Sequence, residues 1–84
     1  MRAIILDFHE FHTSREVHGY LAAKLDFPDY YGHNLDALYD MLTEISEDTC
    51  ITVVCAGQPY EEGFITVFED AAQGNRHFFL TGCR

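Results

Sequence analysis

Three short hydrophobic runs, separated by stretches with helical spacing, constrain the fold of this chain most strongly. The runs lie at residues 2–8, 50–56 and 77–81. Within the first run, residues 3–6 are continuously apolar, as expected for a strand covered on both faces, and the second run is rich in β-branched residues. Strands separated by helices pair in parallel through right-handed crossovers. The order strand, helix, helix, strand, helix, strand therefore predicts an α/β fold, a three-stranded parallel sheet with helices packed against it.

The first and third predicted helices have clear start and stop signals. Thr13 and Glu16 form a capping box, in which each side chain accepts a hydrogen bond from the other residue's backbone. A helix then runs to about Leu25. The third helix starts at Glu61 or Glu62 and runs to residue 73, with Gly74 as its stop. Its two acidic residues suit the positive end of the helix dipole.

The second helix follows a loop at residues 29–33, in which Gly32 is the expected turn residue. Asn34 is a good N-cap, and helical spacing continues to about Ser46. The hydrophobic residues that recur at intervals of three and four are Leu35, Leu38, Leu42 and Ile45. We expect this side of the helix to face the core.

The opposite side of this second helix is acidic. At 100° per residue, Asp40 lies about 40° from Asp36 on the helical wheel, and Thr43 lies about 20° to the other side. Glu44 completes the stripe, and Tyr39 stands at its edge. The helix dipole favours Asp36 in the first turn, but it does not explain Asp40, which repels Asp36. An uncompensated acidic stripe indicates a site for cations, although a solvated helix face is the plain alternative.

The net charge of the chain also indicates a cationic partner. The chain has 14 acidic residues against 5 Lys and Arg, a formal net charge of −9. Such a chain repels nucleic acids and anionic membranes, because phosphate binding depends on cationic side chains. It attracts a basic partner, although acidity can also serve solubility alone. With 48% hydrophobic residues, the 84 residues are expected to fold as one domain, 1–84, rather than as a disordered acidic tail.

The three cysteines, Cys50, Cys55 and Cys83, show no paired spacing. Cys50 and Cys55, five residues apart on one predicted strand, point to opposite faces and cannot bridge without distortion. We therefore expect free thiols and a reducing cytoplasm. The N-terminus reaches Asp7 before a signal peptide could form, and no apolar run is long enough to span a membrane.

The sequence indicates no catalytic or cofactor chemistry of a common type. His9 and His12 flank two residues without a further ligand and predict no metal site. Phosphate-binding glycine loops, dinucleotide fingerprints and Ser-His-Asp patterns are absent from the sequence, so we expect no cofactor. Asp36 and Asp40 could form a pair of acid–base carboxylates, but a convex helix face excludes water poorly. We therefore expect that the protein is not an enzyme.

Residues 28–42 read Pro-Asp-Tyr-Tyr-Gly-His-Asn-Leu-Asp-Ala-Leu-Tyr-Asp-Met-Leu. This segment resembles the signature of the barstar family, small intracellular inhibitors of barnase-type ribonucleases. The weaker resemblance covers nearly the whole chain, and residues 67–71 are similar to the family's last helix. It implies the fold predicted above, with the second helix and its preceding loop inserted into the active site of a basic ribonuclease.

The resemblance implies specific roles for the three aspartates of this site. Asp40 would be the central mimic of an RNA phosphate, meeting arginines and a histidine, and Asp36 would pair with another basic group. Asp70 matches a glutamate of a peripheral salt bridge, although its side chain is shorter. The predicted partner-binding residues are Tyr30, Tyr31, Gly32, His33, Asn34, Leu35, Asp36, Tyr39, Asp40, Thr43, Glu44 and Asp70.

Two features depart from the family pattern. His33 occupies a position that is often acidic in the family, and it could tune partner choice or the response to pH. The connection after the second strand leaves little room for the extra short helix that the family often has.

The expected state is a monomer that forms a 1:1 complex with the ribonuclease. An immunity protein against a toxin nuclease from another cell, or an acidic module for a different basic partner, remain open alternatives.

Overall fold

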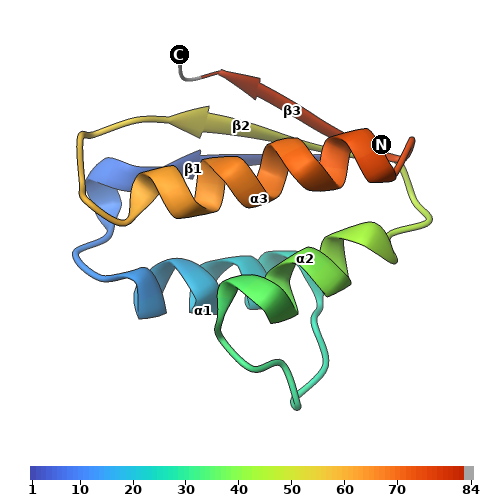
Figure 1. Cartoon of the computed structure of the whole chain (residues 1–84), viewed down its shortest axis with the longest axis horizontal. Coiled ribbons are helices and arrows are strands. Elements are labelled where there is room, and N and C mark those ends of the chain that lie inside the picture. The colour runs from blue at the N-terminus through green and yellow to red at the C-terminus, as the bar shows by residue number, and fades with distance from the viewer. Residues whose placement is uncertain (83–84) are drawn as a thin grey trace.

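The structure is a computed structural model that describes residues 1–82, and its centre is a three-stranded parallel sheet in the order β1-β2-β3 (Figure 1). The strands are β1 (Arg2–Asp7), β2 (Thr49–Val54) and β3 (Phe78–Gly82). In the register, Ile4 is paired with Ile51, and Ile51 is paired with Leu80. The α/β fold with a parallel sheet is therefore confirmed.

Three α-helices and one short 3₁₀-helix connect the strands. They are η1 (Phe8–Glu10), α1 (Ser14–Leu25), α2 (Leu35–Thr43) and α3 (Glu61–Gly74). The capping box that starts α1 is confirmed, because the Thr13 hydroxyl accepts from the Glu16 amide at 3.3 Å and the Glu16 carboxylate accepts from the Thr13 amide at 3.3 Å. The first strand was predicted to reach Phe8, but Phe8 belongs to η1, and α3 includes Gly74 instead of stopping before it.

Helix α2 ends at Thr43, three residues earlier than the predicted Ser46. The buried Asn75 explains this early end. Its side-chain Nδ2 donates to the backbone carbonyls of Leu42 at 2.8 Å and Ile45 at 2.9 Å. Because carbonyls near a helix end lack intrahelical partners, an amide from a distant segment satisfies them and lets the chain turn towards β2.

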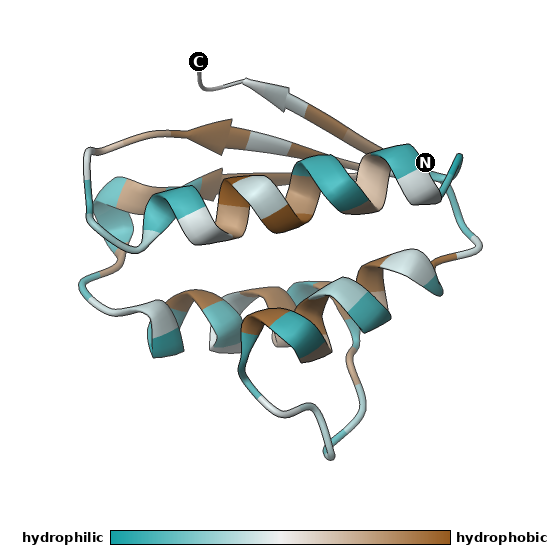
Figure 2. Cartoon of the chain, in the orientation of Figure 1, coloured by the Kyte–Doolittle hydropathy of each residue, from teal (hydrophilic) through white to brown (hydrophobic). Residues whose placement is uncertain are grey.

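The helices cover one face of the sheet. In Figure 1, α1 and α2 are drawn below α3, and α3 contacts both α2 and β3. Figure 2 shows mostly hydrophobic strands and hydrophilic residues on the lower sides of α1 and α2. The buried hydrophobic core consists of Ile4, Leu6, Phe8, Val17, Leu21, Leu25, Tyr31, Leu38, Leu42, Ile51, Val53, Phe64, Phe68, Ala71 and Phe78.

The opposite face of the sheet is not covered by a described helix. Ile5 is 65% exposed, and Val54 and Phe79 are also exposed. The expectation that the first strand is covered on both faces is therefore wrong. Side chains alternate between the two faces of a strand, and only one layer of helices packs on this sheet. A continuously apolar run thus places Ile5 on the open face.

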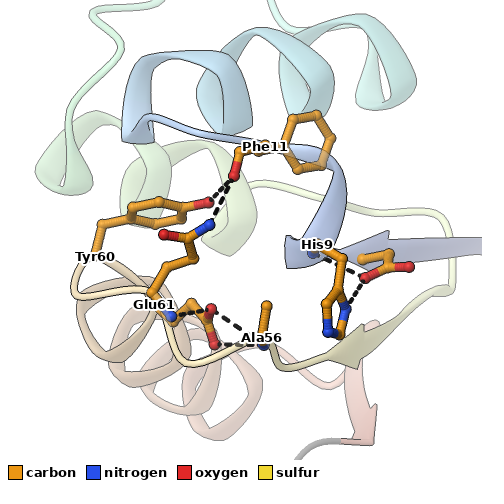
Figure 3. Close-up of polar contacts among 7 residues, drawn as sticks. His9, Phe11, Ala56, Tyr60 and Glu61 are labelled. Carbon is orange, nitrogen blue, oxygen red and sulfur yellow. Dashed lines mark hydrogen bonds and ion pairs between the residues drawn. The ribbon is translucent and has the colours of Figure 1, made fainter.

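A short connection, residues 55–60, leads from β2 into α3 without the extra helix that the resemblance suggested. The buried Glu61 holds it, because its carboxylate accepts from the amides of Ala56 at 3.1 Å and Gln58 at 2.6 Å (Figure 3). The Tyr60 hydroxyl and the Gln58 side chain both donate to the Phe11 carbonyl, at 2.8 and 3.2 Å. The start of α3 is therefore fixed against the segment that precedes α1.

The cysteines differ from expectation. Cys50 is a free thiol, but Cys55 is disulfide-bonded, so the prediction of free thiols is wrong for Cys55. Cys83 lies outside the described residues. The sequence argument excluded only a bridge between Cys50 and Cys55, and spacing alone does not reveal pairings between distant residues. Because the expected reducing compartment rested on free thiols, the disulfide at Cys55 removes one argument for it. No helix within residues 1–82 is long and apolar enough to cross a membrane.

Candidate protein-binding site

The loop before α2 orients its two adjacent tyrosines in opposite directions. Tyr30 is 80% exposed, whereas Tyr31 is 5% exposed and belongs to the core. The Tyr31 hydroxyl lies 2.6 Å from Nδ1 of the buried His18 on α1. Tyr30 is therefore available to a partner, and Tyr31 anchors the loop from below. His18 is a supporting residue that the sequence analysis missed, because nothing local in the sequence links it to the loop.

The turn in this loop is made by His33 and not by Gly32. His33 adopts the left-handed conformation with φ of 54°, whereas Gly32 does not have a positive φ. A hydrogen bond in which the His33 Nδ1–H donates to the Tyr31 carbonyl, at 3.0 Å, offsets part of the cost of this conformation. Gly32 is required for space, since an added Cβ would lie 2.9 Å from Nδ2 of Asn34.

Asn34 sets the start of α2. Its Oδ1 accepts from the Ala37 amide at 2.8 Å, which confirms the predicted N-cap, and its Nδ2 donates to the Gly32 carbonyl at 3.3 Å. The same side chain thus holds both the loop and the first turn of the helix. This double contact fixes the direction in which Asp36 and Asp40 project.

The predicted carboxylates meet in a groove between α2 and α3. The groove has a volume of about 360 Å³ and is lined by Leu35, Asp36, Tyr39, Asp40, Val67 and Asp70. We call it the acidic groove. It brings five of the predicted site residues together and adds Val67, which the sequence analysis did not select. Within residues 1–82, none of the three carboxylates forms an ion pair.

Leu35 lies at the edge of the acidic groove and is 36% exposed. Its predicted place on the core face of α2 is therefore wrong, although Leu38 and Leu42 are fully buried as expected. The helix begins at Leu35, ahead of the part that packs into the core. Gly63 of α3 comes so close that an added Cβ would lie 2.9 Å from Cδ1 of Leu35. Leu35 thus lies at the boundary between the acidic groove and a second cavity, which is described below.

The remaining acidic stripe lies towards the C-terminal end of α2, outside the groove lining. The Thr43 hydroxyl donates to the Asp40 carbonyl at 3.0 Å, so this polar side chain is occupied by its own helix. Glu44 is exposed at the C-cap, and Glu47 lies 3.5 Å from Arg2. The structure therefore gathers Asp36, Asp40 and Asp70 more closely than the full stripe.

Tyr31, which anchors the loop, contacts His18, a residue whose protonation depends on pH. Burial lowers the pKa of His18, and the neighbouring positive charge of His33 lowers it further. The ordinary value of about 6.5 applies to the unfolded chain, which therefore binds this proton more readily than the folded chain.

We expect the free energy of unfolding to fall as the pH decreases below about 6.5, and to stop falling from this cause below the pKa of folded His18. Urea unfolding measured between pH 7.5 and 5 would show this slope. The substitution His18→Gln is expected to remove it. A slope that is unchanged in the folded variant would contradict the assignment.

The residues of the acidic groove do not form a metal centre in the part of the chain that the structure describes. No group of three or more His, Cys, Asp or Glu residues there is placed to hold a metal ion. The carboxylates instead stand beside Tyr39, Leu35 and Val67, which can surround an inserted side chain. This arrangement suits a cationic group that arrives from another protein.

Comparison with known proteins adds an independent finding. The model of the family described as "Barstar (barnase inhibitor)" matches residues 1–80. A protein of Bacillus subtilis (strain 168) named "Putative ribonuclease inhibitor YrdF" is 43% identical over 70 residues, which cover 83% of this chain and 76% of that protein. The family match covers β1, β2, the first three residues of β3, all three α-helices and the acidic groove. The chain belongs to the barstar family.

Proposed function

We propose that this protein inhibits a basic, barnase-like ribonuclease by placing the acidic groove and the loop before it over the enzyme's active site. One observation carries the proposal: Asp36, Asp40 and Asp70 line one groove, and no described cation pairs with them. A ribonuclease cleft is cationic because it binds RNA phosphates. Family membership and the name of the Bacillus subtilis relative support the same assignment.

In this mechanism, Asp40 stands in for an RNA phosphate. Its carboxylate accepts charge-assisted hydrogen bonds from the arginines and the histidine that otherwise hold the substrate. Asp36 and Asp70, on α2 and α3, receive a second basic side chain that enters the groove. The adjacent Leu35, Tyr39 and Val67 exclude water around these pairs, and removal of water strengthens each charge interaction.

The remaining predicted contacts form the rim of the interface. The loop contributes Tyr30, Gly32, His33 and Asn34 to this rim, while Thr43 and Glu44 lie beyond the groove on α2. Tyr31 contributes by anchoring the loop through His18. The net charge of −9 steers the basic enzyme towards this surface, so the association rate should fall as salt is added.

The geometry argues against the alternative of acid–base catalysis. Asp36 and Asp40 are exposed along the helix, so water surrounds both carboxylates in the free protein. Catalytic carboxylates usually depend on a site that closes around the substrate. We therefore propose a non-catalytic inhibitor that acts in the cytoplasm as a monomer and forms a 1:1 complex.

The test is an RNA-cleavage assay with purified protein and barnase-like ribonucleases. We expect cleavage to stop at one equivalent of protein, and mass photometry or light scattering to show a 1:1 complex. Raising the salt should slow association much more than it accelerates dissociation. Absence of inhibition across ribonucleases of this type, including one encoded beside the gene for this chain, would contradict the proposal.

A further inference from the structure

A second cavity lies on the other side of Leu35 from the acidic groove. Its volume is about 460 Å³, and we call it the helix-terminus pocket. It is lined by Ser14, His18, His33, Asn34, Leu35, Pro59, Tyr60, Gly63 and Phe64. This lining contains no Asp, Glu, Lys or Arg, in contrast to the three carboxylates of the groove next to it.

The N-terminal ends of all three α-helices converge on this pocket. Ser14 and Leu35 are the first residues of α1 and α2, and Tyr60 is the N-cap of α3. The first backbone N–H groups of a helix have no acceptor within the helix, and they carry the positive end of its dipole. Three such ends around one cavity favour a negatively charged occupant.

The buried His18 provides an independent reason to expect a hydrogen-bond acceptor there. Its side chain is 3% exposed and lines the pocket. Nδ1 contacts the Tyr31 hydroxyl, which has no other hydrogen-bond partner within residues 1–82. Burial raises the pKa of Tyr31 well above its ordinary value, so the hydroxyl keeps its proton. Because this O–H has no other acceptor among the described residues, it donates a hydrogen bond to Nδ1.

This hydrogen bond determines which nitrogen of His18 carries the proton. Burial lowers the pKa of His18, so the ring is neutral near pH 7 and has one N–H. Because Nδ1 accepts, the proton is on Nε2. Nε2 has no hydrogen-bond partner among the described residues, and it is not among the fully enclosed unpaired atoms. Nε2–H is therefore a partly accessible, unpaired donor on a buried side chain that lines the helix-terminus pocket.

Nearby acidic side chains are turned away from the pocket. Glu61 does not line the pocket, and its carboxylate accepts from the Ala56 and Gln58 amides (Figure 3). The Glu16 carboxylate accepts from the amides of His12 at 2.6 Å and Thr13 at 3.3 Å. The pocket lining thus carries no carboxylate, although the net charge of the chain is −9.

We infer that the helix-terminus pocket receives a carboxylate side chain of the nuclease, bound by Nε2–H of His18 and by the helix-end amides of Leu35 and Gly63, which have no acceptor among the described residues. The inference rests on the proposed function, since Leu35 borders both cavities and one partner surface would cover them together. A free anion is a poorer occupant, because the net charge repels it, whereas a basic protein brings its carboxylate along. The pocket would select nucleases that carry an acidic residue beside their cationic cleft.

Ser14 offers a test that does not disturb the core. It is exposed at the pocket rim, and a glutamate there suits the helix dipole, so Ser14→Glu should not destabilise α1. Arg15→Gln is the matched control, because it also makes the net charge one unit more negative but does not touch the pocket. Against an inhibited barnase-like nuclease, we expect Ser14→Glu to raise the inhibition constant about tenfold, or about 1.4 kcal/mol. Arg15→Gln should change it less than about twofold.

A nuclease-independent measurement separates this inference from the function itself. Sodium acetate, compared with sodium chloride at equal ionic strength, should shift the NMR signals of the Leu35 and Gly63 amides and of the His18 ring. Ser14→Glu should suppress these shifts and Arg15→Gln should keep them. Equal inhibition constants for the two variants, or acetate shifts that persist in Ser14→Glu, would overturn the inference while wild-type inhibition stands. Failure of wild-type inhibition would instead overturn the function, and the partner assignment with it.

Discussion

Replacing Asp40 by alanine is expected to weaken ribonuclease inhibition by a thousandfold or more. Asp40 lies in the middle of the acidic groove, and no described cation pairs with it. In the complex its carboxylate would face several cationic donors that have lost their water. Removing it would leave those charges buried and unpaired, which costs more than the lost contacts alone.

The expected magnitude comes from the family and was not calculated from this chain. The matching aspartate of barstar is among the strongest interface hot spots, with a truncation cost of about 7.7 kcal/mol. We expect at least about 4 kcal/mol for Asp40→Ala, which corresponds to roughly a thousandfold in the inhibition constant. The unfolding free energy should change little, because Asp40 is exposed.

Glu10→Ala is the control for Asp40→Ala. Glu10 is exposed on η1, away from both cavities, and its removal changes the net charge by the same amount. Both variants should therefore lose the same small part of the long-range steering. The difference between their inhibition constants then measures the local role of Asp40. Similar constants for the two variants would refute the phosphate-mimic role.

The order of elements and the parallel sheet were predictable because they follow from local patterns. Hydrophobic runs, the Thr13 capping box and the Asn34 N-cap each depend on residues close in sequence, and each was confirmed. The end of α2 was not predictable in this way. It depends on Asn75, which lies 33 and 30 residues along the chain from Leu42 and Ile45, whose carbonyls it binds.

The candidate site also depends on contacts between distant segments, which local sequence patterns do not reveal. The helical wheel placed Asp36 and Asp40 on one side of α2, but it could not reveal that Asp70 and Val67 of α3 complete a groove. Leu35 followed the apolar spacing and still lies partly at the surface, because it contacts α3 at the edge of the groove instead of packing into the core. The helix-terminus pocket combines the starts of three helices, so no single segment of the sequence could indicate it.

The second large effect concerns stability, and Asn75→Asp is the substitution that tests it. Asn75 is 8% exposed, its Nδ2 donates to the Leu42 and Ile45 carbonyls, and its Oδ1 accepts from the His77 amide at 2.9 Å. An aspartate would direct an ionised oxygen at two carbonyl oxygens. We expect a loss of about 3–5 kcal/mol in unfolding free energy, measured by urea unfolding with an unchanged m-value.

The same chemical change at Asn34 is expected to cost much less, about 1 kcal/mol or below. Aspartate accepts from the Ala37 amide equally well at an N-cap, and the change removes only the exposed hydrogen bond from Nδ2 to the Gly32 carbonyl. The introduced carboxyl at position 75 should have a raised pKa in the folded protein, so its destabilising effect should shrink as the pH falls towards 4. Equal costs at the two positions would show that Asn75 does not hold the end of α2. A cost confined to Asn75, together with an unchanged inhibition constant in the folded variant, would separate the residue that ends the helix from those that contact the nuclease.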